Sequence, residues 1–275
     1  MERCSSFNAY RMCDALWERF RSLLPEYKVS SKGGRPRCPL RRVADAIFYR
    51  LRTGCQWKAI PASLAPGSTA HQYFQEWVGQ GVFDQLWQLA LREYHDLIGF
   101  DWLWQSLDGA ITKAPLGQEL TGPNPTDRGK KGTKRSVITD AKGIPVGLAI
   151  GGANVHDSKL LRATIENCMQ RVPVIRKNGV EHLCLDKAYD SAEIRQMLIE
   201  EFGYTPHIRS RGEEKRQLKK RRRERPRRWV IERLHSWLNR FRGILIRWDK
   251  KAQNYLANLQ FACAFYTFKK LPVFG

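Results

Sequence analysis

Hydrophobic positions in the first hundred residues recur at helical spacing. In LRRVADAIFYRLRTG, which begins at Leu40, apolar residues fall three or four positions apart, and Gly54 is expected to end the helix. STAHQYFQEWVGQG repeats the pattern, with Ser68 as the expected N-cap and Gly79 as the end. The same spacing predicts further helices around residues 14–27 and 82–94. We therefore expect an α-helical domain over residues 1–98.

Short helices joined by tight turns are typical of a helix-turn-helix unit that binds DNA. The helix over residues 68–78 would read the bases, with Thr69, Gln72 and Gln75 pointing outward. A plain helical bundle explains the same pattern equally well, so both interpretations of this domain stay open.

The pattern changes near residue 101 to short segments that are alternating or wholly apolar. DWLWQSLDGAIT predicts one strand, and KRSVITDAKGIPVGLAIGG predicts two more in an antiparallel hairpin. EHLCLD indicates a buried strand that ends at Asp186, and GYTPHI a fifth strand. Helical segments between them give the order β-β-β-α-β-α-β-α over residues 99–275. This α/β order, a mixed sheet flanked by helices, is that of the ribonuclease-H-like fold.

Four helices are expected in this second domain, one of them over DSAEIRQMLIEEF with Asp190 or Ser191 as its cap. Residues 157–170 are helical in pattern, with Asp157 as the expected cap. In RRWVIERLHSWLNRFR, residues 227–242, apolar residues recur at i, i+4, i+7, i+8 and i+11, counted from Val230, and form one face of a helix. The last helix, residues 251–271, is expected to be amphipathic, with an apolar stripe of Tyr255, Leu256, Leu259, Cys263 and Tyr266.

Composition narrows the class of partner. The chain has 48 Lys and Arg against 27 Asp and Glu, a net charge of +21, and 42% of its residues are hydrophobic. A globular protein with this excess usually binds a polyanion, either nucleic acid or an anionic membrane surface. No run of about 18 apolar residues occurs, and the N-terminus lacks the apolar stretch of a signal peptide, so nucleic acid is favoured over a membrane. The seven cysteines are widely spaced without a C-x-x-C pair, which fits reduced thiols in the cytoplasm.

Three carboxylates fall at positions where they could meet. Asp108 is expected at the end of the first strand, Asp186 at the end of the neighbouring fourth strand, and Glu232 on the helix after the fifth. Carboxylates placed in this way can hold two Mg²⁺ ions about 3.5–4 Å apart, with Mn²⁺ as a substitute. One ion would activate a water or a sugar 3′-hydroxyl, and the other would stabilise the leaving oxygen of a phosphodiester.

Each of these carboxylates also has a simpler explanation. Asp108 could be a turn residue. Asp186 could pair with Lys187, and Glu232 could pair with Arg228 on a solvated helix face. The three together, at the expected places in a strongly basic chain, favour a metal site over these separate explanations.

Several motifs resemble those of insertion-sequence transposases with a DDE catalytic domain, of the insertion-sequence-five type. GGRPR, AIFYRLRTGCQWKAIP and STAHQYFQEW are similar to the N-terminal segment of that family. LDGAITKAP resembles the region of its first Asp, KRSVITDAKGIPVGLAIGGANVHDSKLL the stretch that follows, LDKAYDS the segment of the second Asp, and RRWVIERLHSWLNRFR the region of the Glu. The likeness covers residues 10–270 and implies that Asp108, Asp186 and Glu232 are the catalytic metal ligands.

Around the Glu, the family signature is Tyr, two residues, Arg, three residues, Glu, six residues, Lys. Arg228 and Glu232 match it, whereas Arg225 stands at the Tyr place and Asn239 at the Lys place, with Arg240 beside it. The arginines are expected to hold DNA phosphates, and Arg228 to orient the Glu232 carboxylate or a phosphate. The preceding run KKRRRERPRR could equally be a solvated linker, and it could become ordered on DNA.

The resemblance implies an enzyme that binds the terminal inverted repeats of a mobile element, cuts there with Mg²⁺ and joins the 3′ ends to target DNA. It further implies a homodimer or higher multimer on double-stranded DNA, associated with the nucleoid in the cytoplasm of a bacterium. Lys187, Gln72 and Gln75 are further expected DNA contacts. Two alternatives stay open: a non-catalytic DNA-binding protein, such as a repressor or decayed transposase, and a nuclease of the same fold that cuts without joining.

Overall fold

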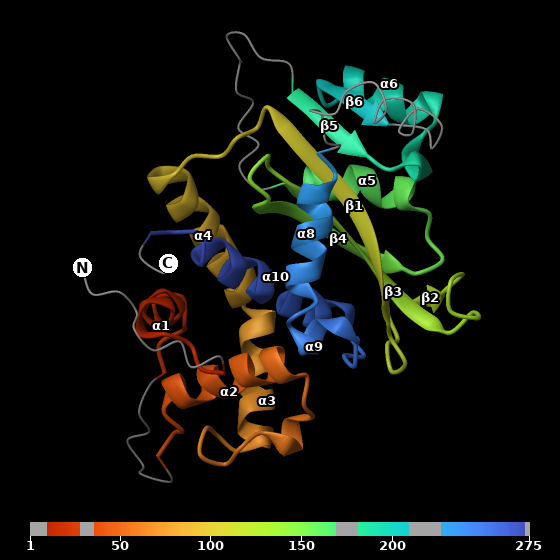
Figure 1. Cartoon of the computed structure of the whole chain (residues 1–275). Helices are drawn as coiled ribbons and strands as arrows, with labels where there is room; N and C mark the ends of the chain where they lie inside the picture. Colours follow the sequence, from red (N-terminus) through yellow and green to blue (C-terminus); the bar gives the residue numbers. More distant parts are fainter. Residues whose placement is uncertain (1–9, 28–35, 169–180, 209–226, 273–275) are drawn as a thin grey trace. The chain divides into compact units, whose positions relative to one another are not determined.

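The computed structural model describes residues 10–27, 36–168, 181–208 and 227–272 (Figure 1). The chain forms two compact units. The helical unit consists of Met1–Ile98 together with Leu238–Gly275, and the sheet unit consists of Gly99–Trp237. The helical unit is therefore discontinuous in sequence, with the sheet unit inserted between its two parts.

The helical unit confirms the helices predicted from spacing. Its elements are α1 (Asp14–Arg21), α2 (Leu40–Thr53), the 3₁₀ turn η1 (Trp57–Ala59), α3 (Gly67–Gly79), α4 (Val82–Leu97), α9 (Arg242–Leu245) and α10 (Ala252–Phe268). The predicted stripe of α2 is buried at Val43, Ile47 and Leu51. Gly54 ends α2 in the left-handed conformation, φ 70°, and its amide donates to the Arg50 carbonyl at 2.8 Å.

The last helix, α10, differs from the amphipathic prediction because it is buried on nearly all sides. It packs against α3, α4 and α9 within the helical unit. Phe261 lies at the centre, with ring centroids 5.7 Å from Phe20, 5.7 Å from Phe48 and 5.4 Å from Phe83. A helix surrounded by other helices has no polar face to reveal in its sequence. Residues 238–275 therefore group with the N-terminal helices, whereas the sequence placed them in the second domain.

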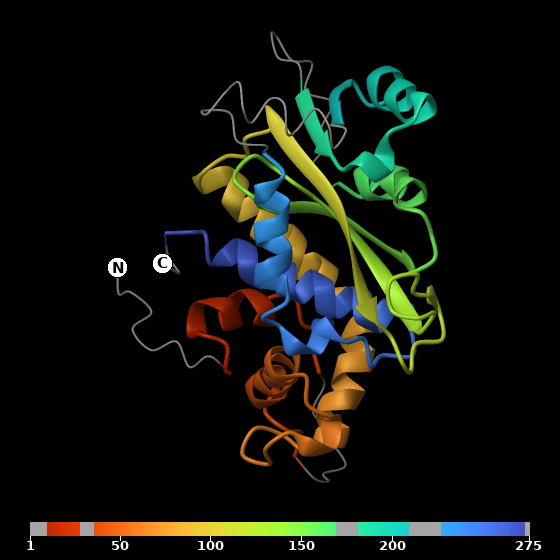
Figure 2. The same ribbon diagram turned by 45° about the vertical axis from the view of Figure 1, so that its right-hand side comes forward.

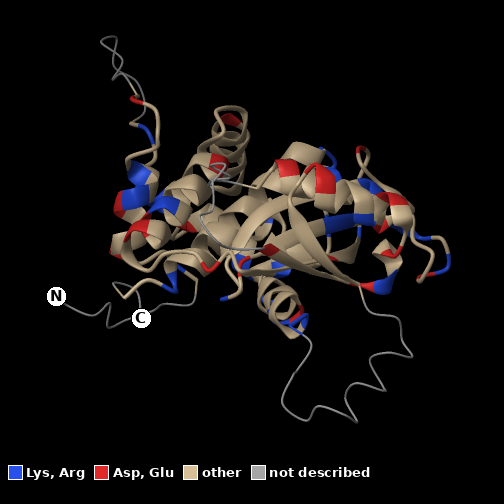
Figure 3. Cartoon of the chain, turned by 90° about the horizontal axis from the view of Figure 1, so that it is seen from above, with Lys and Arg blue, Asp and Glu red and all other residues tan. Residues whose placement is uncertain are grey.

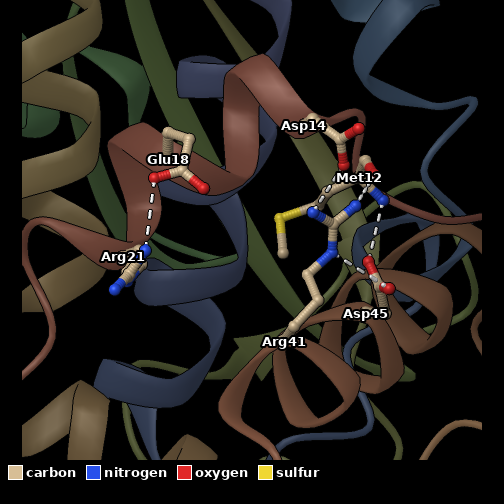
Figure 4. Close-up of polar contacts among 6 residues, drawn as sticks. All are labelled: Met12, Asp14, Glu18, Arg21, Arg41 and Asp45. Carbon is tan, nitrogen blue, oxygen red and sulfur yellow. Dashed lines mark hydrogen bonds and ion pairs between the residues drawn. The ribbon is translucent and has the colours of Figure 1, made fainter.

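A network of polar contacts joins the start of α1 to α2 (Figure 4). The Arg41 guanidinium donates to Asp14 Oδ1 at 2.9 Å, to Asp45 Oδ2 at 3.3 Å and to the Met12 carbonyl. The Met12 amide donates in turn to Asp45 Oδ1 at 3.0 Å. Because Asp45 is only 6% exposed, its negative charge depends on these donors for compensation.

The sheet unit contains the predicted mixed sheet. Its strands are β1 (Trp104–Lys113), β2 (Gly122–Pro123), β3 (Lys131–Thr139), β4 (Pro145–Gly152), β5 (Glu181–Leu185) and β6 (Tyr204–Ile208). β1, β3 and β4 form the predicted antiparallel meander, and β5 and β6 run parallel to β1. The order β4-β3-β1-β5-β6, with the two-residue strand β2 beside β3, is ribonuclease-H-like. Strand β2 has no counterpart in the prediction, because two residues carry no periodicity.

Helices cover both faces of this sheet. They are α5 (Asp157–Glu166), the 3₁₀ turn η2 (Lys187–Tyr189), α6 (Ala192–Glu200) and α8 (Trp229–Leu238). On one face, Thr164 of α5 donates a hydrogen bond to Ser136, which is the β3 partner of Gly109 in β1. On the other, Ser106 of β1 donates to the carbonyl of Arg227, just before α8. Ser106 and Gly109 are three residues apart on β1, so they face opposite sides. α5 and α8 accordingly lie on opposite faces, as Figures 1 and 2 show.

Two expected helix caps are wrong. α3 begins at Gly67 after Pro66, so Ser68 lies inside its first turn. A Cβ at Gly67 would come within 1.9 Å of the Trp57 carbonyl oxygen, so a close backbone approach fixes this start. The N-cap of α5 is His156, whose side chain accepts from the Ser158 amide. Asp157 is therefore not the cap of α5, and its carboxylate is free for another partner.

Candidate catalytic site

Asp108 lies in the middle of β1. The sequence had predicted it at the end of the strand, and that prediction is wrong. β1 pairs with β3 from Ser106 to Lys113, but it pairs with β5 only from Trp104 to Ser106. Beyond Ser106, no described strand pairs with the edge of β1 that faces β5. Asp108 stands two residues beyond the last parallel pair, so it lies past the end of the β1–β5 ladder and not at the end of the strand.

The Asp108 carboxylate is held in a mostly buried environment. Its Oδ1 accepts a 2.8 Å hydrogen bond from the Gly109 amide. Burial raises the pKa of Asp108 to about 6, while the Gly109 hydrogen bond and the nearby Arg228 act to lower it. The charges of Asp186 and Asp157 add to the increase. Asp108 therefore senses three charged neighbours that come from separate segments of the chain.

Arg228 connects the other two predicted carboxylates. Asp186 follows the last residue of β5, and its Oδ1 accepts from the Lys187 amide at 2.6 Å and from Arg228 Nη1 at 3.0 Å. Arg228 Nη2 lies 3.6 Å from Glu232 Oε1, one turn further along the helix. The Asp186 and Glu232 side chains are 44% and 58% exposed, so both can be reached from solvent. The pairing of Arg228 with Glu232 is thus part of a larger arrangement that includes Asp108 and Asp186.

The donor atoms of this site are the hard oxygens that Mg²⁺ and Mn²⁺ prefer. As the described side chains stand, no three acidic, His or Cys groups are close enough to hold one ion. The Arg228 guanidinium instead spans from Asp186 to Glu232 and supplies the positive charge between them. The carboxylate set fits a divalent cation in its chemistry, and Asp108, Asp186 and Glu232 are the residues that would hold it.

A fourth carboxylate, Asp157, lies behind the site and was not among the predicted residues. Its Oδ1 lies 3.1 Å from Lys134 Nζ, which also donates to the Val155 carbonyl at 2.7 Å. A Cβ added to Gly109 would come within 2.3 Å of Asp157 Oδ1, so this carboxylate lies directly against β1. The signals in the sequence were the motif ANVHDS and the glycine that follows Asp108.

Tyr189 adds a buried hydroxyl to the same region. It is 1% exposed, and its oxygen completes no hydrogen bond within the part of the chain described. Burial raises the pKa of the Tyr189 phenol, and the charges of Asp157, Asp108 and Asp186 raise it further, while the Ser136 hydroxyl nearby lowers it slightly. Tyr189 therefore lies among three of the carboxylates as a neutral group.

His235 supports α8 from its inner side. It is 9% exposed, close to the Asp108 backbone and to Arg135. Burial lowers the pKa of His235 to about 3, and the positive charge of Arg135 adds to the decrease. The ring is neutral at physiological pH. It packs on the inner side of α8, the same helix that carries Glu232.

The predicted DNA contacts are distributed over both units. Lys187 is exposed next to Asp186, and Arg240 and Gln72 are exposed in the helical unit. Gln75 is only partly exposed and its Nε2 is buried, which differs from the expected outward position. Arg225 lies outside the described residues.

Acidic and basic residues are mixed over the described helices (Figure 3), and ten of the 48 Lys and Arg fall in residues 209–226, outside the described part. Six of the seven cysteines are in the described ranges, and none of these six is in a disulfide. None of the helices described there is both long and apolar enough to cross a membrane.

Two family models match the chain. A model described as "Transposase DDE domain" matches residues 106–266, and one described as "Putative transposase of IS4/5 family" matches residues 12–87. A Burkholderia cepacia protein, "Putative transposase for insertion sequence element IS402", is 35% identical over 151 residues, which cover 54% of this chain and 68% of that protein. A second protein of that organism, "Insertion element IS402 uncharacterized 16.2 kDa protein", is 28% identical over 41% of this chain and 79% of its own length.

Solved structures offer a weaker likeness. A crystal structure of a pre-cleavage Mos1 transpososome aligns with 85% of this chain and 85% of that chain, at 11% identity and a TM-score of 0.29. The assignment rests instead on the sequence matches, because the DDE model spans more than half of the chain. With its ribonuclease-H-like sheet and its 35% identity to a relative from an insertion sequence, the chain belongs to the DDE transposases of insertion sequences, and it is a DNA transposase.

Proposed function

We propose that Asp108, Asp186 and Glu232 are the catalytic carboxylates of this transposase and that they hold Mg²⁺, for which Mn²⁺ can substitute. A DDE transposase domain implies a divalent metal. The observation that carries the assignment is the position of Arg228, which lies 3.0 Å from Asp186 Oδ1 and 3.6 Å from Glu232 Oε1. One guanidinium joins a residue after β5 to a residue on α8, beside the mostly buried Asp108.

The chain's own residues divide the work. The bound metal would lower the pKa of the attacking water or 3′-hydroxyl and stabilise the leaving oxygen. Asp108 is fixed by the Gly109 amide, and Asp186 by the Lys187 amide, so two of the ligands are oriented before DNA arrives. Arg228 neutralises Asp186 and Glu232, and with a cation bound to these carboxylates its guanidinium would be available to a DNA phosphate.

The DNA is double-stranded and carries the inverted repeats that end the mobile element. In this proposal Lys187, Arg228, Arg225 and Arg240 contact phosphates, which gives salt-dependent affinity with little sequence information. Gln72 on α3 reads bases in a helix-turn-helix-like mode, with Gln75 as a second contact that must first rotate outward. A homodimer or higher multimer would hold two element ends and join their 3′ ends to target DNA.

The test is cleavage of end-labelled DNA that carries the flanking inverted repeat, with Mg²⁺, Mn²⁺ or EDTA. Wild type should nick the DNA only with metal, and Glu232→Gln should bind the DNA but not cut it. Glu200→Gln is the matched control, because it removes an exposed carboxylate of α6 whose side chain contacts Gln196. Cleavage by Glu232→Gln at the wild-type rate would overturn the site assignment. Joined products in a strand-transfer assay distinguish a transposase reaction from simple nicking.

A further inference from the structure

An aromatic cluster occupies the same face of the sheet as the proposed catalytic carboxylates. Trp104 and Asp108 are four residues apart on β1, so both point to the face covered by α8. His182 of β5 pairs with Trp104 across the strands, and Asp186 follows four residues later. The cluster and the carboxylates are therefore two ends of one two-stranded platform, about 13 Å apart at the usual rise of a strand.

Two imidazoles fix the Trp104 ring. The centroids of Trp104 and His182 are 4.2 Å apart with planes at 26°, a stacked arrangement. The His207 ring centroid lies 4.8 Å from that of Trp104, and His207 Nε2 lies 2.9 Å from His182 Nδ1 within a hydrogen bond. Three adjacent strands contribute these rings, so their contacts restrict the orientation of the Trp104 ring.

Arg227 lies above this support. Its Cζ is 4.5 Å from the centroid of the Trp104 ring, and its carbonyl accepts a 3.4 Å hydrogen bond from Ser106. Arg227 is exposed, and no carboxylate of the described residues pairs with it. Its neighbour Arg228 is engaged by Asp186 and Glu232. Of two consecutive arginines, one serves the carboxylates and the other holds its charge over an aromatic ring beside them.

We propose that Arg227, positioned by Trp104, His182 and His207, binds a phosphate of the DNA strand that is being cut. A guanidinium over an aromatic face keeps its N–H donors at its edge, where they can bind phosphate oxygens in pairs. The stacking also limits the rotamer freedom that a phosphate contact would otherwise have to restrict. Because Trp104 is about 13 Å along β1 from Asp108, a phosphate bound over the Trp104 ring would lie within a few nucleotides of the bond that is broken. This inference rests on the proposed function.

The test is the salt dependence of binding to inverted-repeat DNA, measured by fluorescence anisotropy with EDTA to prevent cutting. Arg227→Gln should reduce the slope of log K against log salt by about 0.9, the loss of one phosphate contact. Arg162→Gln is the matched control: Arg162 also lies over a ring, 5.5 Å from Phe202, but pairs with Glu201 at 2.8 Å and Glu166 at 3.5 Å. It removes the same charge and should leave the slope unchanged.

Variants of the support separate charge from position. Trp104→Leu leaves Arg227 in place without a ring beneath it and should lower affinity at least threefold, while Trp104→Phe should recover most of it. Arg227→Lys keeps the charge without the planar edge and should fall between wild type and Arg227→Gln. A wild-type slope in Arg227→Gln would overturn the inference even if Trp104→Leu fails to fold. A wild-type slope in Arg227→Gln would leave the assignment of the three carboxylates intact. Conversely, cleavage by Glu232→Gln would contradict the carboxylate assignment and leave the phosphate contact of Arg227 untouched.

Discussion

Asp157 Oδ1 lies 3.1 Å from Lys134 Nζ, and the pair fills the space directly behind Gly109. A Cβ at position 109 would come within 2.3 Å of that oxygen, so Gly109→Ala must move either Asp157 or β1. Since Gly109 also supplies the amide that holds Asp108, we expect DNA cleavage to fall by at least about tenfold with DNA binding kept. Gly79→Ala is the control, because a Cβ there meets nothing within 4 Å. Equal cleavage rates for the two variants would contradict this account.

Arg228→Lys tests the bridge between Asp186 and Glu232. A single ammonium cannot bond both carboxylates with the geometry that the guanidinium achieves at 3.0 Å and 3.6 Å. We expect a loss of about tenfold in the cleavage rate and a change of less than about threefold in DNA affinity, since the charge is retained. Arg195→Lys alters a comparable pair, the 2.8 Å contact with Asp190, and should leave both quantities unchanged. The measurement is single-turnover cleavage alongside anisotropy binding.

His235 should make the protein less stable in acid. Its folded pKa of about 3 lies below the ordinary value of 6.5, so the fold favours the neutral ring. The resulting stabilisation is present above pH 6.5 and is lost as pH falls toward 3, by up to about 1.4 kcal/mol per pH unit.

Two other buried groups act in the opposite direction. Asp108 and Asp140, with pKa values raised to about 6, favour the fold as pH falls from about 6 to 4. The free energy of unfolding of wild type minus that of His235→Leu isolates the contribution of the histidine. This quantity should decrease as pH falls from 7 to 4. Urea unfolding at each pH measures it, with the exposed His95→Leu as control. A difference that is constant over this range would contradict the buried neutral ring.

The two ion pairs Arg41–Asp45 and Arg21–Glu18, both drawn in Figure 4, are expected to contribute very differently to the free energy of unfolding. Asp45→Ala leaves the Met12 amide without its buried acceptor and removes one of the carboxylates that Arg41 contacts, so it should lower the free energy of unfolding by about 2–4 kcal/mol. Glu18→Ala breaks an exposed 3.6 Å contact with Arg21 and should cost less than about 0.5 kcal/mol. Thermal unfolding of both variants checks the order, and equal shifts in Tm would argue against the α1–α2 network.

The strands and helices could be predicted because their spacing is local. Leu40–Thr53 and the β3–β4 hairpin follow from patterns that a single segment carries. The position of Asp108 could not be predicted in the same way, because the parallel ladder that stops at Ser106 depends on β5, where Cys184 pairs with Ser106 from 78 residues further along the chain (184 − 106). The sequence predicts Asp157 as a helix cap because Asp is a good cap, yet Asp157 begins α5 and its partner Lys134 is on strand β3. Periodicity describes one element at a time, whereas these contacts depend on how elements meet.

The burial of α10 has a consequence for biosynthesis. Phe20, Phe48 and Phe83 emerge early from the ribosome, but the ring that fills the space between them, Phe261, is translated near the end of the chain. The N-terminal helices must therefore wait, incompletely packed, while the whole sheet unit is made. A nascent chain that still lacks α10 would leave that aromatic surface open to chaperones and proteases, so the helical unit closes only once α10 has been made.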